Sequence, residues 1–334
     1  MNTTIQMLRR RQRLKTKLSV IIPNYNGLAY IEACMDSLFK QQVSSFEIIV
    51  VDDASTDGSL AFIKDKYPQN DTYPRVRYIV HRDNLGFARS VNDGIWASQS
   101  DYVLLLNNDT VVEADFVYRM YKAIRRSDSI FSVSARMVNL YDRNRMDNAG
   151  DFYNILGWAR TPAKDKPLSD FDKKKKIFSS CGGAAIYRKS ILKKIGTFDD
   201  AHFAYLEDVD LGYRSQLYGY TNIYEPKAIV YHAGSATSGS RYNDFKARLT
   251  ARNNVYVIYK NMPNWQIALN CPFIVAGFAI KTLFYFKKGF GNSYLKGLLE
   301  GLRTAKGLKR VDFKAVGLRR LAHIEAQLLA ATRY

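Results

Sequence analysis

The 334-residue sequence has little cysteine, and its three cysteines form no metal-binding or disulfide pattern. Cys34, Cys181 and Cys271 lie far apart in the chain, without a CxxC pair. A disulfide framework or a zinc knuckle needs paired or closely spaced cysteines, so both are disfavoured. The same scarcity favours a reducing compartment, and we expect a cytoplasmic protein.

Two nucleotide-binding signatures are also missing. No GxGxxG follows the first expected strand, and no GxxxxGK[ST] occurs anywhere in the chain. A dinucleotide-dependent oxidoreductase and a P-loop NTPase are therefore disfavoured. No apolar stretch precedes Leu18, so the basic start of the sequence does not resemble a secretory signal.

Acidic residues are scarce at both ends of the chain, and the formal net charge is +19. Residues 1–17 hold six Arg or Lys and no acid, whereas residues 251–334 hold fourteen against three acids. The segment between them is nearly neutral. A basic nucleic-acid-binding protein is the non-enzymatic alternative, and it is disfavoured because the charge lies outside the α/β core and no recognition motif is evident. We expect no nucleic-acid partner.

Short apolar runs alternate with helical segments in the first third of the chain. The runs, typical of parallel strands buried on both faces, lie at 18–23, 46–53, 75–80 and 101–109. Helical spacing occupies 29–41, 59–67 and 86–98. This order predicts an α/β fold with a Rossmann-like, mostly parallel central sheet flanked by helices.

The composition changes beyond residue 260. Residues 265–286 are mostly apolar and nearly long enough to span a bilayer, but Asn270, Pro272 and Lys281 interrupt them and many Lys and Arg follow. We predict an amphipathic helix that lies in an anionic membrane surface. A true span, a soluble helical tail and a homodimer contact are the alternatives. The expected domains are a basic segment at 1–17, an α/β domain at 18–260 and a membrane-interfacial helical region at 261–334.

Polar residues follow three of the expected strands, in "PNYNG" (23–27), "DDASTDG" (52–58) and "NNDT" (107–110). Ligands of parallel sheets bind beyond the carboxyl ends of the strands, so these loops should face one crevice. Helix capping explains one carboxylate of Asp52 and Asp53 but not both. The oxygen ligands of "NNDT" suit Mg²⁺ or Mn²⁺ bridging a diphosphate.

Six motifs, taken in order, resemble the family 2 inverting glycosyltransferases with the GT-A fold, and most closely their rhamnosyltransferase-like branch. They are "VIIPNYNG", "IIVVDDASTDGS", "NLGFARSVNDGI", "DYVLLLNNDTVV", "CGGAAIYRKSILKKIGTFDDAHFAYLEDVDLGYR" and "AIVYHAG". The resemblance covers about residues 18–260 and is specific as a set.

The resemblance implies a site for a nucleotide-sugar donor. The expected donor-binding residues are Pro23, Asn24, Tyr25, Asn26, Asp52, Asp53, Asn84, Arg89, Asn107, Asn108 and Asp109. Asn84 and Arg89 lie at a helix N-terminus, which suits a phosphate. The alternative for "DASTDGS" is a set of caps and turns without a ligand.

The resemblance also implies a Mg²⁺ or Mn²⁺ site. The family's DxD element corresponds to Asn107-Asn108-Asp109, whose last carboxylate would bind the metal, and His232 of "VYHAG" matches a position that often completes the metal shell. Asparagine at the first DxD position removes one carboxylate, so the strictness of the metal dependence is open. Without the resemblance, a single histidine beside a strand is more often structural.

The acidic cluster "EDVD" holds Glu207, Asp208 and Asp210 within four positions. Inverting transfer needs one carboxylate to take the proton of the acceptor hydroxyl, because a metal-bound diphosphate leaves without a proton. The second residue of the family's ED motif is that base, which here is Asp208. Glu207 and Asp210 are expected either to raise its basicity by like-charge repulsion or to orient the loop and the acceptor. The alternative is a helix start stabilised by acids in its first turn.

Three further expectations concern the acceptor and the donor phosphates. Cys181, Gly182 and Gly183 are expected beside the acceptor, since glycine allows close backbone approach, and an empty tight turn is the alternative. Cys181 itself is expected to be a packing residue rather than a nucleophile. Arg248 and Arg252 either neutralise the donor diphosphate or form a basic face beside lipid headgroups.

The resemblance implies dTDP-L-rhamnose as donor, a polyprenyl-diphosphate-linked glycan as acceptor, and a role in cell-surface polysaccharide synthesis at the cytoplasmic face of the cell membrane. The family also uses UDP-hexoses, which are the alternative donors. A pseudoenzyme that binds nucleotide sugars is a further alternative. A processive synthase is disfavoured, because no QxxRW-like element or set of spanning segments is visible.

Overall fold

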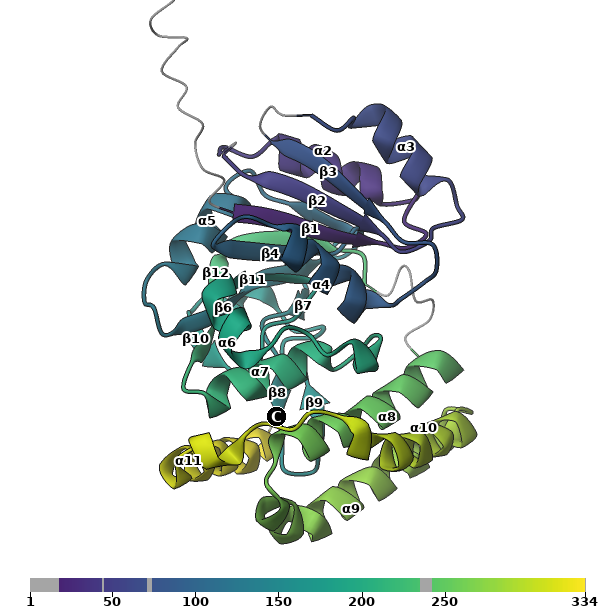
Figure 1. The fold of residues 1–334 in the computed structure, drawn as a ribbon, viewed down its shortest axis with the longest axis vertical. Coiled ribbons are helices and arrows are strands. Elements are labelled where there is room, and N and C mark those ends of the chain that lie inside the picture. Colours follow the sequence, from purple (N-terminus) through teal and green to yellow (C-terminus); the bar gives the residue numbers. More distant parts are fainter. Residues whose placement is uncertain (1–17, 44, 71–73, 235–241, 334) are drawn as a thin grey trace, which may run out of the picture.

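Hydrogen bonding between strands builds one 10-stranded sheet from the described part of the chain (Figure 1). This computed structural model describes residues 18–43, 45–70, 74–234 and 242–333, so the basic segment predicted at 1–17 lies outside it. The order across the sheet is β10 (Lys175–Ile177), β12 (Thr221–His232), β6 (Ile130–Asn139), β11 (Ala184–Arg188), β4 (Tyr102–Leu106), β1 (Leu18–Asn24), β2 (Glu47–Asp52) and β3 (Arg75–Val80). Two short strands join its side, β5 (Thr110–Val112) on β12 and β7 (Met146–Asn148) on β6.

Strand direction divides the sheet into two parallel groups joined by one antiparallel strand. β3, β2, β1 and β4 are parallel to one another, as the apolar runs predict, and β6 is parallel to β12. β11 lies between the groups and is antiparallel to both β4 and β6. Its first residues therefore lie at the same edge of the sheet as the last residues of β4.

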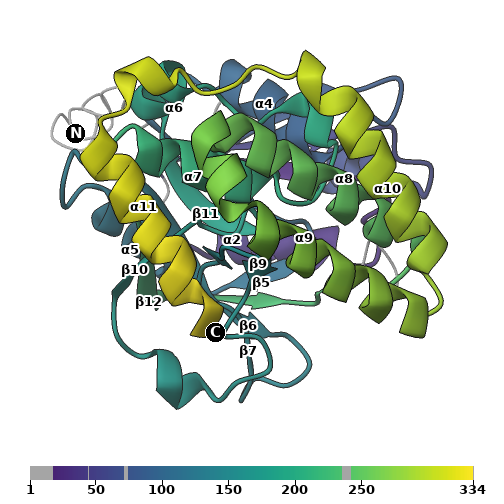
Figure 2. The same cartoon turned by 90° about the horizontal axis from the view of Figure 1, so that it is seen from below.

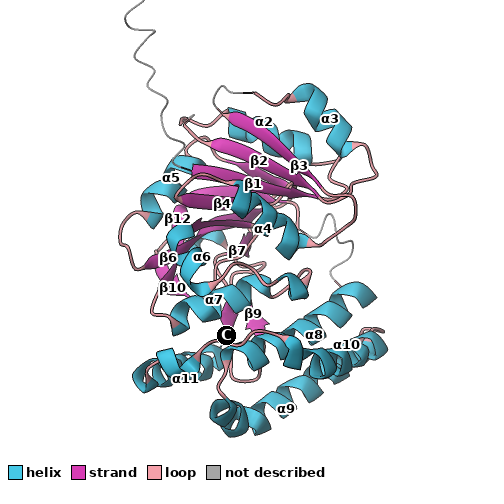
Figure 3. Ribbon diagram, viewed as in Figure 1, coloured by secondary structure: helices cyan, strands magenta, loops and turns pink. Residues whose placement is uncertain are grey.

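Helices cover both faces of this sheet (Figure 3). Neighbouring residues of one strand point to opposite faces, so Val20 and Ile22 pack in one apolar cluster and Ile21 in another. The first cluster includes residues of α2 (Ile31–Phe39), α3 (Ser59–Lys66) and α5 (Phe116–Ile124). The second includes residues of α4 (Phe87–Ala97), α6 (Lys189–Ile195) and α7 (Glu207–Leu217). Burial on both sides explains why the strands are apolar throughout.

The chain after residue 243 forms a layer of helices beneath the sheet domain (Figure 2). They are α8 (Asp244–Asn261), α9 (Asn264–Lys287), α10 (Gly291–Thr304) and α11 (Leu318–Ala330). α10 lies close against α8, because a β-carbon at Gly297 would fall 2.1 Å from the carbonyl oxygen of Arg248. A third apolar cluster joins Tyr213 of α7 to Leu321 of α11, so these helices share a core with the sheet domain.

A small hairpin lies between the sheet and this helical layer. Its strands, β8 (Phe152–Tyr153) and β9 (Ala159–Arg160), are antiparallel. The hairpin reaches α9 because Gly277 has no side chain: a β-carbon there would fall 2.1 Å from the carbonyl oxygen of Leu156. Nε1 of Trp158 donates a hydrogen bond to the carbonyl oxygen of Gly277 at 3.0 Å.

The apolar segment predicted at 265–286 is the helix α9, which by length and composition is able to cross a membrane. In α9, polar side chains are buried and apolar side chains are exposed, the reverse of the pattern in a helix on the surface of a soluble protein. Gln266 and Asn270 are buried and donate hydrogen bonds to Glu325, whereas most of its large apolar side chains face outward. The exposed ones are Trp265, Leu269, Phe273, Val275, Ile280, Leu283, Phe284 and Phe286. The predicted amphipathic helix thus has an apolar outer side, with Lys287 at its end.

Candidate active site

A cavity of about 750 Å³ opens at the sheet edge where β1 and β4 end. Most of the residues predicted for the site line it: Pro23, Asn24, Tyr25, Asp53, Asn84, Asn107, Asn108, Asp109, Cys181, Gly182, Gly183, Glu207, Asp208 and His232. The antiparallel β11 explains why the glycine turn meets the end of β4, since the backbone N–H of Asn107 donates to the carbonyl of Gly183 at 2.9 Å. The predicted residues Asn26, Asp52, Arg89 and Asp210 do not line the cavity.

Asn24 ties the ends of three strands together beneath the cavity. Its amide nitrogen donates to Asp52 Oδ1 at 2.8 Å, and its Oδ1 accepts from Asn108 Nδ2 at 2.8 Å. The other carboxylate oxygen of Asp52 accepts the N–H of Ser55 at 3.1 Å. Asp52 therefore stabilises the turn after β2 and the side chain of Asn24, whereas neither aspartate caps α3, whose first residue Ser59 donates its N–H to Asp57.

Asp53 is the carboxylate that faces the cavity, and it also holds the loop before α4. Its two oxygens accept the backbone N–H groups of Leu85 at 2.9 Å and Gly86 at 2.8 Å, and Oδ1 lies 2.8 Å from Nδ1 of His81. Asn84, in the same loop, lines the cavity. Asp53 thus fixes the backbone of the loop before α4, which forms the part of the cavity wall that contains Asn84.

Two predicted donor-binding residues have partners outside the cavity. Arg89 pairs with Asp93 at 3.0 Å and Asp200 at 3.3 Å, so its guanidinium is already neutralised on the surface of α4. Asn26 is exposed, and its Oδ1 accepts the N–H of Thr56 at 2.8 Å. The polar atoms of both residues are therefore engaged outside the cavity, Arg89 mainly within α4 and Asn26 with the loop after β2, and their contact with a donor stays a prediction.

Asp109 and His232 come together, although 122 positions of sequence separate them. Nε2 of His232 lies 3.2 Å from Asp109 Oδ1, and Nδ1 lies 2.8 Å from Asp147 Oδ2. Burial alone would lower the pKa of His232, but the hydrogen bonds with Asp109 and Asp147 outweigh it and raise this pKa to about 9. Burial would likewise raise the pKa of Asp147, but His232 and Lys164 hold it below the usual value.

This donor set fits a divalent cation. A carboxylate that fixes one nitrogen of a histidine orients the other nitrogen toward a metal, and Asp147 holds His232 in this way. Asp109 then supplies a carboxylate oxygen beside Nε2. Asn108 is engaged with Asn24, so the protein offers few ligands and a bound diphosphate would complete the shell. Sequence reasoning missed Asp147, which no motif marks.

Asp208 lies half-buried at the start of α7, on the cavity wall. Its Oδ2 accepts the N–H of Gly182 at 2.9 Å and its Oδ1 the N–H of Val209 at 2.8 Å. Removal from water raises the pKa of Asp208 above its usual value despite these hydrogen bonds. A carboxylate with a raised pKa is a stronger proton acceptor at neutral pH.

Glu207 also lines the cavity, but its carboxyl group is buried. Its Oε2 has no hydrogen-bond partner among the described residues, and burial, followed by the charge of Asp208, raises its pKa well above the usual value. The raised pKa shows that the charges of Glu207 and Asp208 oppose each other, and an effect of Glu207 on the basicity of Asp208 stays a prediction.

Asp210 points away from the cavity into a buried ion network. Its carboxylate contacts Arg214 and Lys260, each at 2.9 Å, and accepts from Asn261 Nδ2 at 2.7 Å. Burial would raise its pKa, but Arg214 and Lys260 hold it far below the usual value. Two residues apart on a helix, Asp208 and Asp210 face nearly opposite directions, so Asp210 anchors α7 and does not reach an acceptor in the cavity.

The turn before α7 has an unusual backbone. Phe203, Tyr205 and Leu206 all have positive φ angles, between 61° and 71°, which cost energy for non-glycine residues. The side-chain amide of Asn253 in α8 donates to the carbonyls of His202 and Ala204 and, at 2.7 Å, to that of Tyr205. α8 therefore holds the strained turn that presents Asp208.

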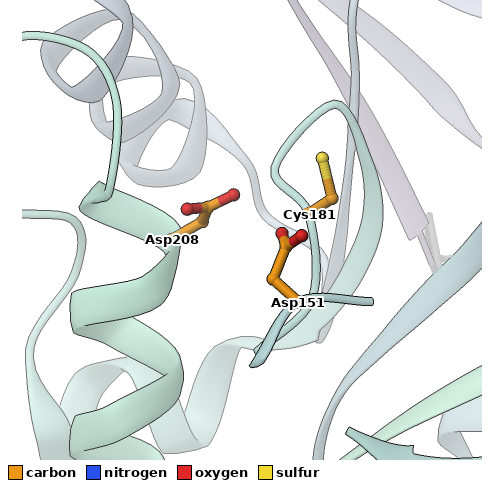
Figure 4. A group of neighbouring side chains, drawn as sticks. All are labelled: Asp151, Cys181 and Asp208. Atoms are coloured by element: carbon orange, nitrogen blue, oxygen red, sulfur yellow. The ribbon is translucent and has the colours of Figure 1, made fainter. Parts of the chain in front are cut away.

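A second carboxylate lies beside the candidate base (Figure 4). Ligand atoms of Asp151, Cys181 and Asp208 lie within 4.8 Å of one another. Burial, then the charge of Asp208, raises the pKa of Asp151 to about 7. Burial raises the pKa of the Cys181 thiol well above its usual value, so it is inert, as expected for a packing residue. Sequence reasoning missed Asp151, because only the folded hairpin brings it to α7.

Other cavity residues that the sequence did not suggest come from the loop before α7 and from the C-terminal helices. They include Phe203, Tyr205, Phe245, Lys246, Thr250 and Lys281. Arg248 and Arg252 do not line the cavity and pair with Glu300 of α10 at 2.7 and 3.2 Å. Neither of the two predicted roles, neutralising the donor diphosphate and forming a basic face beside lipid headgroups, includes this pairing with Glu300.

The fold defined by this sheet and its flanking helices is the GT-A fold of nucleotide-sugar-dependent transferases. The chain belongs to glycosyl transferase family 2, whose family model matches residues 19–196, more than half of its length. The family and the fold inferred from the motifs are thus confirmed, while the rhamnosyltransferase branch stays a prediction.

Individual relatives are distant. Glycosyltransferase GlyG of Streptococcus pneumoniae is 31% identical over 137 residues, which cover 41% of this chain and 42% of the relative. Poly-beta-1,6-N-acetyl-D-glucosamine synthase of Staphylococcus epidermidis is 24% identical over 227 residues, covering 66% of this chain and 51% of the synthase. The chain therefore spans about half the length, or less, of these relatives.

Among solved structures, GalNAc-T7 with UDP, GalNAc and Mn²⁺ superposes with a TM-score of 0.61 at 14% identity. The match covers 89% of this chain and 55% of that one. At 14% sequence identity, this structural similarity is evidence for a shared fold alone.

Proposed function

We propose that the protein is an inverting glycosyltransferase that moves a sugar from a nucleotide-sugar donor to a hydroxyl of a lipid-linked glycan. The observation that carries this proposal is the placement of Asp208 on the same cavity as Asp109 and His232. A single base opposite a site for a metal-bound diphosphate is what an in-line displacement needs. The pseudoenzyme alternative is less well supported, because the half-buried carboxylate of Asp208 is kept basic.

In the proposed reaction, Asp208 accepts the proton of the acceptor hydroxyl. The acceptor oxygen forms a bond to the anomeric carbon, the bond from that carbon to the diphosphate oxygen breaks, and the electron pair leaves with the nucleoside diphosphate. Attack from the face opposite the leaving group inverts the configuration. A bound Mg²⁺ or Mn²⁺, held by Asp109 and His232, would neutralise charge on the departing diphosphate.

The remaining cavity residues would position the two substrates. Asp53 and Asn84, with Tyr25, would border the nucleotide, and Asn107 the sugar side of the diphosphate. The turn of Gly182 and Gly183 would face the acceptor. Its backbone leaves room there, since a β-carbon on Gly182 would come within 3.3 Å of the ring of Phe87.

The donor we propose is dTDP-L-rhamnose, from the motif resemblance, with a UDP-hexose as the second candidate. The UDP donor is supported by the structural neighbour crystallised with UDP and Mn²⁺. A role in bacterial polysaccharide synthesis is supported by the synthase among the relatives.

We further propose that the protein acts at the cytoplasmic face of the cell membrane, attached through α9. Support comes from the exposed apolar side chains of this helix, which are unfavourable in water. Basic residues follow it, including Lys287 and Lys288, and attract an anionic leaflet. A homodimer through the same face is the second candidate.

The test is a screen of nucleotide sugars for hydrolysis and transfer with Mn²⁺, Mg²⁺ or EDTA. Wild type should hydrolyse one donor in a metal-dependent way, and Asp208→Asn should lose about 10²- to 10⁴-fold in transfer rate. Asp115→Asn, at a partly exposed aspartate that precedes α5 and pairs with Arg119, is the control outside the cavity and should keep wild-type activity. Near wild-type transfer by Asp208→Asn would exclude the base, and activity in EDTA would exclude the metal role of Asp109 and His232.

A further inference from the structure

A cation from the outermost apolar helix reaches the catalytic cavity. α9 carries two charged residues, and one of them, Lys281, lines the cavity together with Ala159 of the hairpin. Its neighbours along the helix, Ile280 and Leu283, are exposed. A lysine placed inward on a helix whose outer side is apolar links the cavity to the proposed membrane face.

Lys281 and the nearby Arg160 lack a counter-ion. Among the described residues, no carboxylate forms an ion pair with either side chain. Burial, helped by the charge of Arg160, lowers the pKa of Lys281 to about 8, which leaves it mostly protonated at neutral pH. An unpaired, partly buried cation lowers the stability of the fold, and an anionic ligand would remove that cost.

Trp158 holds the two cations in a fixed relation. The guanidinium carbon of Arg160 lies 4.9 Å from the centre of a Trp158 ring, and Nζ of Lys281 lies 5.6 Å from it. The indole is itself fixed by its hydrogen bond to the carbonyl of Gly277. Arg and Lys placed in this way suit the several oxygens of a phosphate or diphosphate.

The helix that carries Lys281 lies away from the strands that carry the predicted nucleotide-binding loops. Figure 1 shows α9 at the opposite end of the molecule from β1, β2 and β3, which carry the predicted nucleotide-binding loops. The hairpin with Arg160 begins at Asp151, beside Asp208, and Thr161 at its other end donates to Asp151 at 2.6 Å. The hairpin that carries Arg160 is thus anchored, through Asp151, at the side of the cavity that holds Asp208, and we assign Lys281 and Arg160 to this acceptor side.

We propose that Lys281 and Arg160, both in contact with Trp158, bind the diphosphate of a prenyl-diphosphate-linked acceptor whose prenyl chain lies along the apolar side of α9. This inference rests on the proposed function and narrows its acceptor class. Because Lys281 and Asp208 line the same cavity, with Arg160 exposed beside it, the acceptor carries a short glycan, in which the reacting hydroxyl lies only a sugar or two from the diphosphate.

The test is binding of farnesyl diphosphate in neutral detergent micelles, followed by tryptophan fluorescence. UDP or dTDP is added at a saturating concentration together with Mn²⁺ to fill the nucleotide end of the cavity. The fluorescence change then reports binding of farnesyl diphosphate at the acceptor end. Wild type should bind saturably, and Lys281→Gln and Arg160→Gln should each bind about tenfold more weakly. Lys281→Arg should restore binding. Lys194→Gln, at an exposed lysine of α6 outside the cavity, should bind within about twofold of wild type.

Each alternative outcome is informative. Unchanged affinity in Lys281→Gln, with a wild-type melting temperature, would overturn the inference while leaving donor hydrolysis by wild type as a separate test of the proposed function. Equal competition by phosphatidylglycerol micelles would mean that the cations bind lipid headgroups in general and would also overturn it. Absence of donor hydrolysis by folded wild type would instead refute the proposed function, whatever farnesyl diphosphate does.

Discussion

The backbone N–H of Gly182 donates a hydrogen bond to Oδ2 of Asp208 at 2.9 Å. This contact joins the glycine turn before β11 to the first turn of α7, two segments that the fold brings together from 26 positions apart. It fixes one oxygen of the candidate base, and Val209 fixes the other. The base therefore has a defined direction before any substrate binds.

The raised pKa of Asp208 predicts the acidic limb of the pH profile. The base acts when deprotonated, and removal from water raises its pKa, so activity should be lost as pH falls through a value above the usual aspartate range. The measurement is kcat/KM against pH at saturating metal and at constant ionic strength. An acidic limb at the usual aspartate value, or none, would contradict the assignment.

Asp151→Asn should stabilise the protein at alkaline pH. The pKa of Asp151 is about 7 in the folded protein and near 3.8 in the unfolded chain, so its ionisation lowers stability progressively as pH rises from about 4 to 7 and fully above 7. The neutral amide avoids this cost and can still accept from Asn148 and Thr161. We expect a melting temperature higher by roughly 2–4 °C at pH 8.5, for about 1 kcal/mol, and little change at pH 4. Equal shifts at both pH values would exclude the ionisation as the cause.

Asp147→Asn should weaken metal binding without touching a metal ligand. Asp147 orients His232 through Nδ1, and loss of such a partner typically costs about 10- to 100-fold in metal affinity. Titration with Mn²⁺, followed by electron paramagnetic resonance of the free ion, measures this. Asp142→Asn, an exposed aspartate five positions earlier, is the control. Wild-type affinity in Asp147→Asn would mean that His232 is not a ligand.

Asp210→Asn should destabilise the fold. It leaves Arg214 and Lys260 buried without their shared carboxylate, which we expect to cost about 3–5 kcal/mol in the free energy of unfolding. Urea denaturation provides the measurement. Asp128→Asn removes the exposed partner of Arg188 and should change stability by less than about 1 kcal/mol. If Asp210→Asn has the wild-type free energy of unfolding but no longer binds the acceptor, Asp210 acts on the acceptor and not as an anchor of α7.

Charge placed on the outer side of α9 should release the protein from lipid. Phe273→Glu with Leu283→Glu adds two carboxylates to the exposed apolar residues, so sedimentation with phosphatidylglycerol vesicles should fall at least about tenfold. Tyr118→Glu, at an exposed aromatic residue of α5, should sediment as wild type does. Unchanged lipid binding together with conversion of a dimer to a monomer in analytical ultracentrifugation would identify the face as a dimer contact.

The first half of the fold could be predicted because its signal is local. The strands from Leu18 and Glu47 contain consecutive apolar residues, 20–22 and 48–51, since both of their faces are covered, and the intervening segments have helical spacing. β6, β11 and β12 could not be placed in the same way. Their order depends on pairing between residues far apart, such as Ile186 with Leu104 and Val133.

The site was predictable to the extent that motifs mark single positions. Asp109, Asp208 and His232 were found in this way, and all three line the cavity. Asp147 and Asp151 carry no motif and act only through partners that the fold supplies. The inward direction of Asp210, by contrast, follows from helical geometry, because residues two positions apart on a helix do not share a face.

The three positive φ angles before α7 have a practical consequence. That turn has little preference of its own for the shape it adopts, and the amide of Asn253 in α8 imposes it from outside. Trimming the chain after residue 243 to obtain a more soluble protein would discard this brace along with α9. The remaining sheet domain would keep its sequence motifs and lose the contact that aligns Asp208.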